Sequence, residues 1–499
     1  MARVARTAIV GRAEAEDALR SRDGGLVREH VVGDGRFAAV DGPFREYERV
    51  VESSPLDDDR IRLTERIWFR LAVPYFGWLF VLPVRWALVR GDRRTPWWAP
   101  PERLDARAAS ALGTLAAASV LGGYMAALLS TTIAFAGREF DAGPGPQGVA
   151  GLVVRLGGLL AVVAATAADR AGRRRVILAT AGAAAVLTAV GAAAPSLPWL
   201  AAAQTLARGL AVAALIAAWI SVAEEMPAGS RAYGVSLLTL AVGLGGGLVI
   251  MALPLADLGV SAWRLLYVVP LLGLALLPGV ARRLPETRRF AVPHPDVALP
   301  GHGRRLWLLA ASAFLVGIFT SPAAFFANRY LLDERGFTAA GVTVLALVTS
   351  LPGLLGMVLG GRLADTRGRR PVGAVGVAGS VAATLLFYGT SGAALWAWSV
   401  AGALIGSAAI PALGVYGPEL FPTSLRGRAG GLIAAVGVVG SGLGIAAAGL
   451  LAERSGSMGS ALVWLAPAPL VVAVLVLAAY PETAHRELED LNPEDRPTA

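Results

Sequence analysis

Three short polar signatures occur twice in this 499-residue chain, at an almost constant offset. The first residues of the paired copies are Asp169 and Asp365 for D-x-x-G-R-R, Glu224 and Glu419 for E-x-x-P-x-x-x-R, and Pro285 and Pro481 for P-E-T. Paired copies lie 195 or 196 positions apart, and each copy follows a long apolar run. A repeat of this kind predicts two similar membrane halves that are fused in tandem.

The composition is typical of a protein that crosses a membrane many times. Apolar residues make up 55% of the chain and charged residues 16%, and the mean hydropathy is +0.59. These values exclude an ordinary soluble protein and a disordered one. The formal charge of +9 does not indicate a nucleic acid partner, because the Arg residues lie in short loops between apolar runs. With no Cys in the chain, disulfides and thiol chemistry are excluded.

The first 105 residues are polar or interrupted and are expected to form a cytoplasmic or interfacial extension without a secretory signal. Segments 47–52 and 61–67, joined by the turn-forming residues 54–58, predict a β-hairpin. Residues 67–90 are apolar and aromatic but contain Pro74, Pro83 and Arg85. This segment could cross the bilayer or lie in its interface, and we favour the interface because such residues make a poor span.

From residue 106 onward, apolar runs of roughly 20 residues follow one another, a length that suits membrane-spanning helices. The twelve predicted spans lie near 109–136, 148–168, 175–194, 198–222, 232–253, 262–280, 306–330, 339–361, 371–390, 393–416, 429–452 and 460–479. The predicted fold is an all-α membrane protein with an extension (1–105), a six-helix bundle (106–281), a linker (282–305), a second six-helix bundle (306–480) and a tail (481–499). Arg is concentrated in the loops that carry the signatures, so the positive-inside rule places those loops, the tail and the extension in the cytoplasm.

The signature loops resemble those of a known transporter family. The sequence GRLADTRGRR at 361–370 resembles the signature loop of the major facilitator superfamily, and PELFPTSLRGR at 418–428 resembles its sugar-porter and organic-ion branch. Both P-E-T copies match that branch, and the likeness covers roughly residues 106–490. The resemblance implies a secondary transporter that moves a solute by alternating access. We expect a monomer without cofactor or metal, whose partners are a small-molecule solute and the lipid bilayer.

The resemblance also implies a cytoplasmic ion network that holds the halves together when the cavity opens outward. Its expected members are Asp169, Arg173, Glu224, Arg231, Asp365, Arg369, Glu419 and Arg426. A carboxylate beside a turn-forming Gly and several Arg can pair with those cations or cap a helix. The alternative is that the Arg residues only fix the membrane orientation through the positive-inside rule. That rule requires no Asp or Glu at matched positions of the two halves, so we favour the ion network.

Two Arg residues lie inside predicted spans, where an ionisable side chain is costly and suggests a functional site. Arg208 is near the middle of the fourth span, with Gln204 one turn earlier on the same helix face, and Arg155 is in the second span. The alternative for Arg208 is a bond to a free carbonyl between helices. Further substrate-binding candidates lie on helices that resemble the cavity-lining helices of the family. They are Tyr124, Asn328 and Trp396, with Thr320, Ser321, Trp398 and Ser407 as additional candidates.

No Asp or Glu lies in the middle of a predicted span, and all four His lie outside the spans. The predicted membrane interior therefore lacks the side chains that usually carry protons in transporters. It also lacks an acidic side chain that would bind a cationic drug. Two embedded Arg favour a small polar solute that is anionic or carboxylated, with a sugar-like solute as the other option. A sensor that binds solute without moving it is the alternative function. The sequence contains no recognisable catalytic set, so we do not expect an enzyme.

Overall fold

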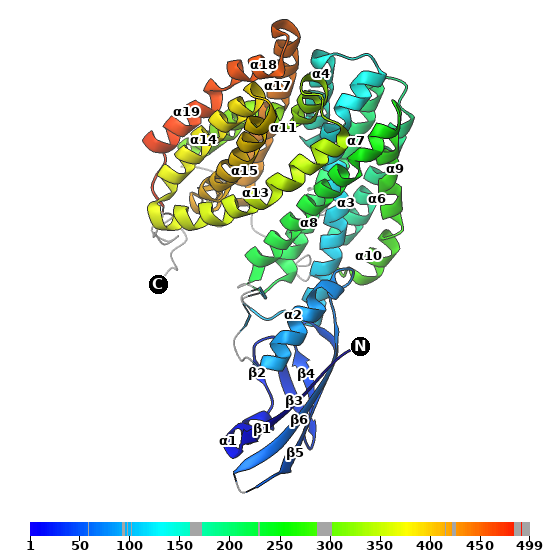
Figure 1. Ribbon diagram of the computed structural model, residues 1–499, viewed down its shortest axis with the longest axis vertical. Helices are drawn as coiled ribbons and strands as arrows, with labels where there is room; N and C mark the ends of the chain where they lie inside the picture. Colours follow the sequence, from blue (N-terminus) through cyan, green and yellow to red (C-terminus); the bar gives the residue numbers. More distant parts are fainter. Residues whose placement is uncertain are drawn as a thin grey trace.

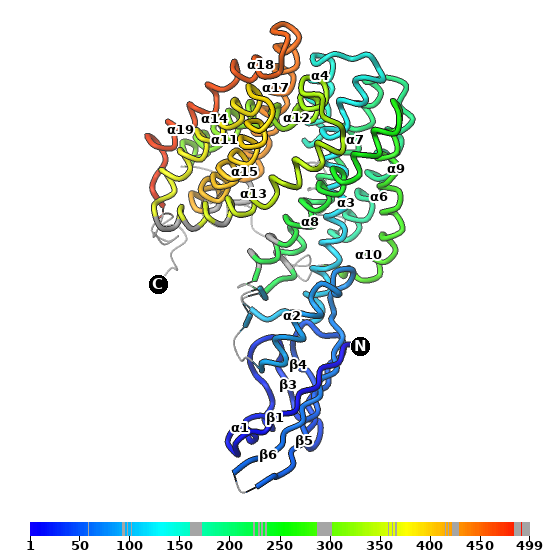
Figure 2. Tube along the Cα trace, viewed as in Figure 1, coloured from blue at the N-terminus to red at the C-terminus, as the bar shows by residue number. Residues whose placement is uncertain are grey.

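The computed structural model describes residues 1–57, 59–91, 95–96, 98–100, 102–159, 172–227, 230–286, 302–414, 416–421, 426–483 and 491. It consists of a small β-sheet domain at one end and a large helical part (Figure 1). The helical part is made of two groups of helices, one from each half of the sequence. The chain runs from the sheet through α2 into α3, the first long helix (Figure 2).

The N-terminal domain is a six-stranded antiparallel sheet with the strand order β1-β6-β5-β4-β3-β2. Its elements are β1 (Ala2–Gly11), α1 (Arg12–Ala18), β2 (Asp23–Gly24), β3 (Val27–Gly33), β4 (Arg36–Asp41), β5 (Phe44–Pro55), β6 (Arg60–Leu71) and α2 (Gly77–Arg90). Along β6, alternate residues such as Ile67 and Phe69 are buried, as in a strand with one face on a core. Val84 and Leu88 of α2 complete that core.

An ion cluster is buried in the same domain. The guanidinium group of Arg49, 1% exposed, lies 2.7 Å from the carboxylate of Glu29 and 3.3 Å from that of Glu65. The hydroxyl of Tyr47 donates a hydrogen bond to Glu29 over 2.5 Å. Each buried charge therefore has a partner, which is the condition under which such groups are tolerated in a core.

The sequence predicts only part of this domain. Segments 47–52 and 61–67 do pair, as β5 and β6, but within a six-stranded sheet rather than in a lone hairpin. The segment 67–90 is also divided, since β6 continues to Leu71 and α2 begins at Gly77. With 14 residues, α2 is shorter than the roughly 20 that cross a bilayer, and it is not among the candidate spans.

The helical part begins with α3. The elements of the first half are α3 (Ala106–Glu139), α4 (Pro144–Leu156), η1 (Gly157–Leu159), α6 (Arg173–Val190), η2 (Gly191–Ala193), α7 (Leu197–Glu225), α8 (Arg231–Ala252), η4 (Leu253–Leu258), α9 (Arg264–Leu274) and α10 (Leu277–Arg283). The elements of the second half are α11 (Gly303–Phe325), α12 (Ala327–Arg329), η5 (Tyr330–Glu334), α13 (Ala339–Arg367), α14 (Arg369–Gly389), α15 (Gly392–Gly414), α16 (Tyr416–Glu419), α17 (Arg426–Ser455), α18 (Met458–Leu465) and α19 (Pro467–Ala478).

Eleven helical segments of the described chain are long and apolar enough to cross a membrane, five in the first half and six in the second. The predicted span 148–168 begins in α4 and continues into residues 160–171, which lie outside the described residues. The multi-pass fold is therefore confirmed, while the total of twelve spans stays a prediction.

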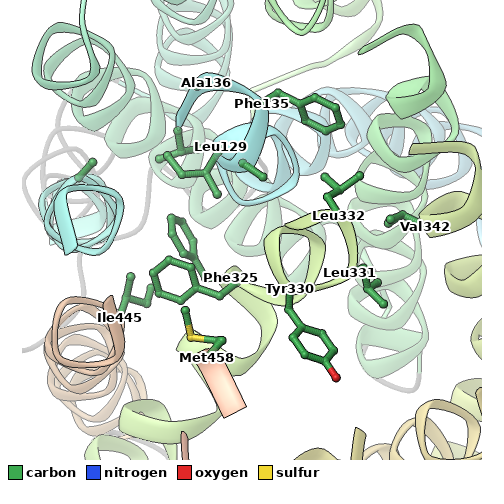
Figure 3. Packing of buried hydrophobic residues seen from close by; sticks show 14 of the residues in the cluster. Leu129, Phe135, Ala136, Phe325, Tyr330, Leu331, Leu332, Val342, Ile445 and Met458 are labelled. Atoms are coloured by element: carbon green, nitrogen blue, oxygen red, sulfur yellow. The ribbon is translucent and has the colours of Figure 1, made fainter. Parts of the chain in front are cut away.

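The apolar cores show how the two halves meet. One cluster combines residues of both halves, including Leu129 and Phe135 from α3 and Phe325, Ile445 and Met458 from the second half (Figure 3). Two other clusters each draw on one half only, the first together with residues of the N-terminal extension. They contain residues next to the signature turns, near Leu284 in the first half and near Tyr480 in the second. The halves are thus packed together at one end, which we call the far end, and have separate cores at the other, which we call the signature end.

Candidate functional site

At the signature end, each half has the same glycine turn. Gly172 and Gly368, 196 positions apart, have φ values of +94° and +96°, a conformation that favours glycine. A helix begins directly after each turn, and its first amides are capped by the Glu of the P-E-T signature. Glu286 accepts from the amide of Arg173 over 2.8 Å, and Glu482 accepts from that of Arg369 over 3.0 Å. A carboxylate at a helix N-terminus is stabilising, so the first and third signatures form one structural unit.

In the second half, all three signatures are joined by one side chain. The guanidinium group of Arg369 donates to the carboxylate of Glu419 and, over 2.8 Å, to the hydroxyl of Thr483. In the first half, Arg107 of α3 makes a two-pronged contact with Glu225 at 3.0 and 3.1 Å. Each of these bonds lies within one half. Asp169 lies outside the described residues, and so do the side chains of Glu224, Arg231, Asp365 and Arg426, so the predicted cross-half network stays a prediction.

At the far end, two acidic side chains cap helices that belong to the other half. Glu453 of α17 accepts from the amide of Gly145 at the start of α4 over 2.9 Å. Asp257 of η4 accepts from the amide of Ala339 at the start of α13 over 3.1 Å. Asp257 and Glu453 are 196 positions apart, the same offset that separates the signatures. We call this symmetric pair of contacts the far-end caps.

Other polar contacts also cross between the halves at the far end. Arg138 of α3 pairs with Asp333 of η5 at 2.5 Å. The side-chain amide of Asn328 donates to the carbonyl of Thr131 over 3.1 Å, and the hydroxyl of Thr343 donates to the carbonyl of Ile250 over 2.8 Å. The sequence predicted none of these contacts, and Asn328 was expected to bind substrate instead. The repeat offset was the available signal for the caps, because it relates Asp257 to Glu453.

The two embedded arginines lie on neighbouring helices of the first half. Arg208 of α7 donates one hydrogen bond to the carbonyl of Ala126 of α3, over 2.6 Å. Arg155 lies on α4, which packs against α7, and its charge is close enough to act on Arg208. Neither Arg takes part in any of the ion pairs found between described residues. A guanidinium has five N–H donors, so Arg208 keeps several for another partner.

Arg155 also faces the other half. A Cβ placed on Gly442 of α17 would lie 3.7 Å from the Cβ of Arg155, which puts this Arg at the boundary between α4 and α17. Helices α4 and α17 make one of the large contacts between the halves. Relative movement of the halves would therefore change the surroundings of Arg155.

Two other predicted site residues point elsewhere. Gln204 is 3% exposed, and its amide donates toward the carbonyl of Thr188 of α6 over 3.4 Å. It therefore faces α6, whereas Arg208 faces α3. Tyr124 is 5% exposed and donates its hydroxyl to the carbonyl of Leu266 over 3.0 Å. In this conformation, both side chains serve packing between helices of the first half.

The second half contains a cavity of about 740 Å³ between α11, α13, α14 and α15. Thr320, Asn328 and Trp398 are among its lining residues, beside apolar side chains such as Phe319 and Phe387. The predicted site residue Trp396 is not in this lining and packs near Phe337, with the ring centres 6.2 Å apart. Ser321 receives a hydrogen bond of 2.6 Å from Ser441, between α11 and α17.

Comparison with known proteins agrees with this architecture. Residues 308–498 match the sequence family described as Major Facilitator Superfamily. The chain is also similar in structure to the xylose transporter XylE from E. coli in its inward open conformation (TM-score 0.64, 17% identity, 77% of this chain and 98% of that chain). The fold is that of the major facilitator superfamily.

Two further solved structures of this fold are similar. A bacterial homologue of the human lysosomal transporter Spinster, inward-facing and unoccupied, has a TM-score of 0.58 at 16% identity and covers 78% of this chain and 98% of its own. The nucleoside transporter NupG has a TM-score of 0.61 at 14% identity and covers 74% of this chain and 100% of its own. No curated protein matched the chain by sequence. All three of these similar structures are those of transporters.

Proposed function

We propose that the chain is a secondary transporter for a small anionic solute, and that Arg208 and Arg155 bind the solute's carboxylate or phosphate group. The observation that carries this proposal is the pair of arginines on the neighbouring helices α4 and α7, neither of which has an ion-pair partner among the described residues; both lie inside spans predicted from the sequence. An embedded charge without a counter-charge is costly, so a ligand that supplies the negative charge is a physical reason for its presence. The planar guanidinium group suits carboxylate and phosphate oxygens.

The separate cores at the signature end and the shared core at the far end support the second part of the proposal, alternating access. If the positive-inside rule applies, the signature end is cytoplasmic, and this conformation is open toward the cytoplasm. Alternation then consists of opening the far end while the signature turns of the two halves approach each other. The cytoplasmic ion network expected from the sequence would form in that second state.

A thermal-shift screen of the purified protein tests the solute class. We expect carboxylates or phosphate esters to raise the melting temperature, because a ligand at 100 times its Kd stabilises a protein by about 2.7 kcal/mol. Neutral sugars and cations should not stabilise it. Stabilisation by neutral sugars without any effect of anions would refute the anionic class.

Arg208→Ala should weaken binding of the stabilising anion by about tenfold to about a hundredfold, since hydrogen bonds to charged groups contribute roughly 1.5–3 kcal/mol. The matched control is Arg175→Ala, which removes an exposed Arg at the signature end. Flux of the same anion into vesicles separates transport from sensing. Binding without flux in the intact chain would favour a sensor, and unchanged affinity in Arg208→Ala would reject the role of Arg208.

A further inference from the structure

An apolar cavity of about 380 Å³ lies where the N-terminal domain meets the membrane helices. Its walls come from three parts of the chain: the sheet, α2 with the segment after it, and the pair α3 and α8. Figure 1 shows α2 between the sheet and the helical part. Representative lining residues are Leu26, Phe80, Leu112, Ala116, Leu237 and Ala241.

Two polar side chains in this wall have partners within the protein. Arg103 is the charged lining residue, and its guanidinium group donates to the carbonyl of Gly25 over 3.4 Å and lies 3.9 Å from the carboxylates of Asp23 and Asp41. The hydroxyl of Tyr233, also in the lining, donates to the carbonyl of Trp98 over 3.0 Å. The remaining wall is almost entirely hydrocarbon. An occupant must therefore be apolar along its length, which fits an alkyl chain.

The cavity is continuous with the surface of a membrane helix. The candidate span of α8 begins at Leu237, and the lining residues Leu240 and Leu244 are 58% and 51% exposed. A membrane helix exposes such leucines to lipid. The cavity thus borders the hydrocarbon of the bilayer, and lipid tails are its nearest source of apolar chains.

Helix α2 provides a surface for the other end of a lipid. Trp78, Leu82 and Trp86 follow one another at four-residue intervals and are 72%, 72% and 65% exposed, so they share one helix face. Arg85 and Arg90 of the same helix are also exposed. Exposed Trp belongs at the level of the lipid headgroups, and Arg pairs with phosphate.

We propose that this cavity binds one acyl chain of an anionic membrane phospholipid, whose headgroup lies at the Arg-bearing surface of α2. The chain would touch the sheet domain, α3 and α8 at once. It would fill the junction between the N-terminal domain and the first half of the transporter. This proposal does not depend on the identity of the solute.

The test uses the full chain in phosphatidylethanolamine–phosphatidylglycerol vesicles in which the phosphatidylglycerol carries a photoreactive acyl chain. After illumination, peptide mass spectrometry should find adducts in residues 71–84, 109–116 and 233–244. Ala241→Leu, which narrows the cavity, should reduce these adducts at least about tenfold, the factor expected for excluding about two methylene groups. Gly243→Leu is the matched control, because a Cβ there meets no atom within 4 Å.

Ala116→Leu narrows the same cavity from α3 and should have the same effect if Ala241→Leu does not fold. Equal labelling in Gly243→Leu and in a folded cavity variant would overturn the proposal. Adducts from a photoreactive free fatty acid, without adducts from the phospholipid, would overturn it as well.

Discussion

The far-end caps make a quantitative prediction about the conformational equilibrium. In this conformation, the carboxylates of Asp257 and Glu453 each cap a helix of the other half. Opening the far end must break both contacts. Replacing both acids by Ala removes them in advance and should therefore shift the equilibrium toward the state that is open at the far end.

The size of the shift follows from the energy of helix caps. Loss of an N-terminal cap costs about 0.5–2 kcal/mol, so two caps are worth about 1–4 kcal/mol. This corresponds to a factor between about five and about a thousand in the ratio of the two states. The contact between Arg138 and Asp333 remains in the double variant, and exposed ion pairs contribute at most about 1 kcal/mol.

Distances between two spin labels measure this equilibrium, and the chain has no native Cys to interfere. Ser196 and Ser391 lie in the far-end turns before α7 and α15, so cysteines at these positions place one label on each half. The double variant should show a larger share of long distances than the parent. Glu139→Ala is the control, because Glu139 pairs with Arg264 within the first half at 2.8 Å. If the distance distribution of the double variant equals that of the parent, the apolar core rather than the caps holds the far end closed.

Other predictions concern local stability. Arg49→Ala should destabilise the sheet domain by about 3–5 kcal/mol, because it leaves the charge of the buried Glu29 without its cationic partner. Faster hydrogen exchange of β5 and β6 in the full chain would show this, while Arg66→Ala, at an exposed pair, should change little. Gly368→Ala should cost about 1–3 kcal/mol through its positive φ, seen as a lower melting temperature. Gly389→Ala, at a helix end with open space around its Cβ, should leave the melting temperature nearly unchanged.

The sequence predicted those features of the fold that depend on local patterns. Apolar runs and turn signals identified the helices, and the turn after β5 identified its pairing with β6. The pairing of β1 with β6 joins Ala2 to Phe69, and nothing local indicates so distant a contact. The sequence therefore predicted only two strands of a sheet that has six.

The candidate site was harder to predict, because side-chain surroundings depend on how helices pack. Gln204 and Arg208 are four positions apart and were expected to share a face. In an α-helix this spacing still leaves about 40° between them, and α7 has neighbours on several sides. Gln204 consequently contacts α6 and Arg208 contacts α3.

The two ends of the molecule use the same kind of contact with different connectivity. At the signature end, Glu286 and Glu482 cap helices of their own halves, so these caps need not break when the halves move. At the far end, Asp257 and Glu453 cap helices of the opposite halves, so these caps must break. A rigid-body movement therefore conserves the first pair and loses the second. The duplicated sequence places both pairs at the same repeat offset, so equivalent positions of the two halves provide both the rigidity of each half and the closure between them.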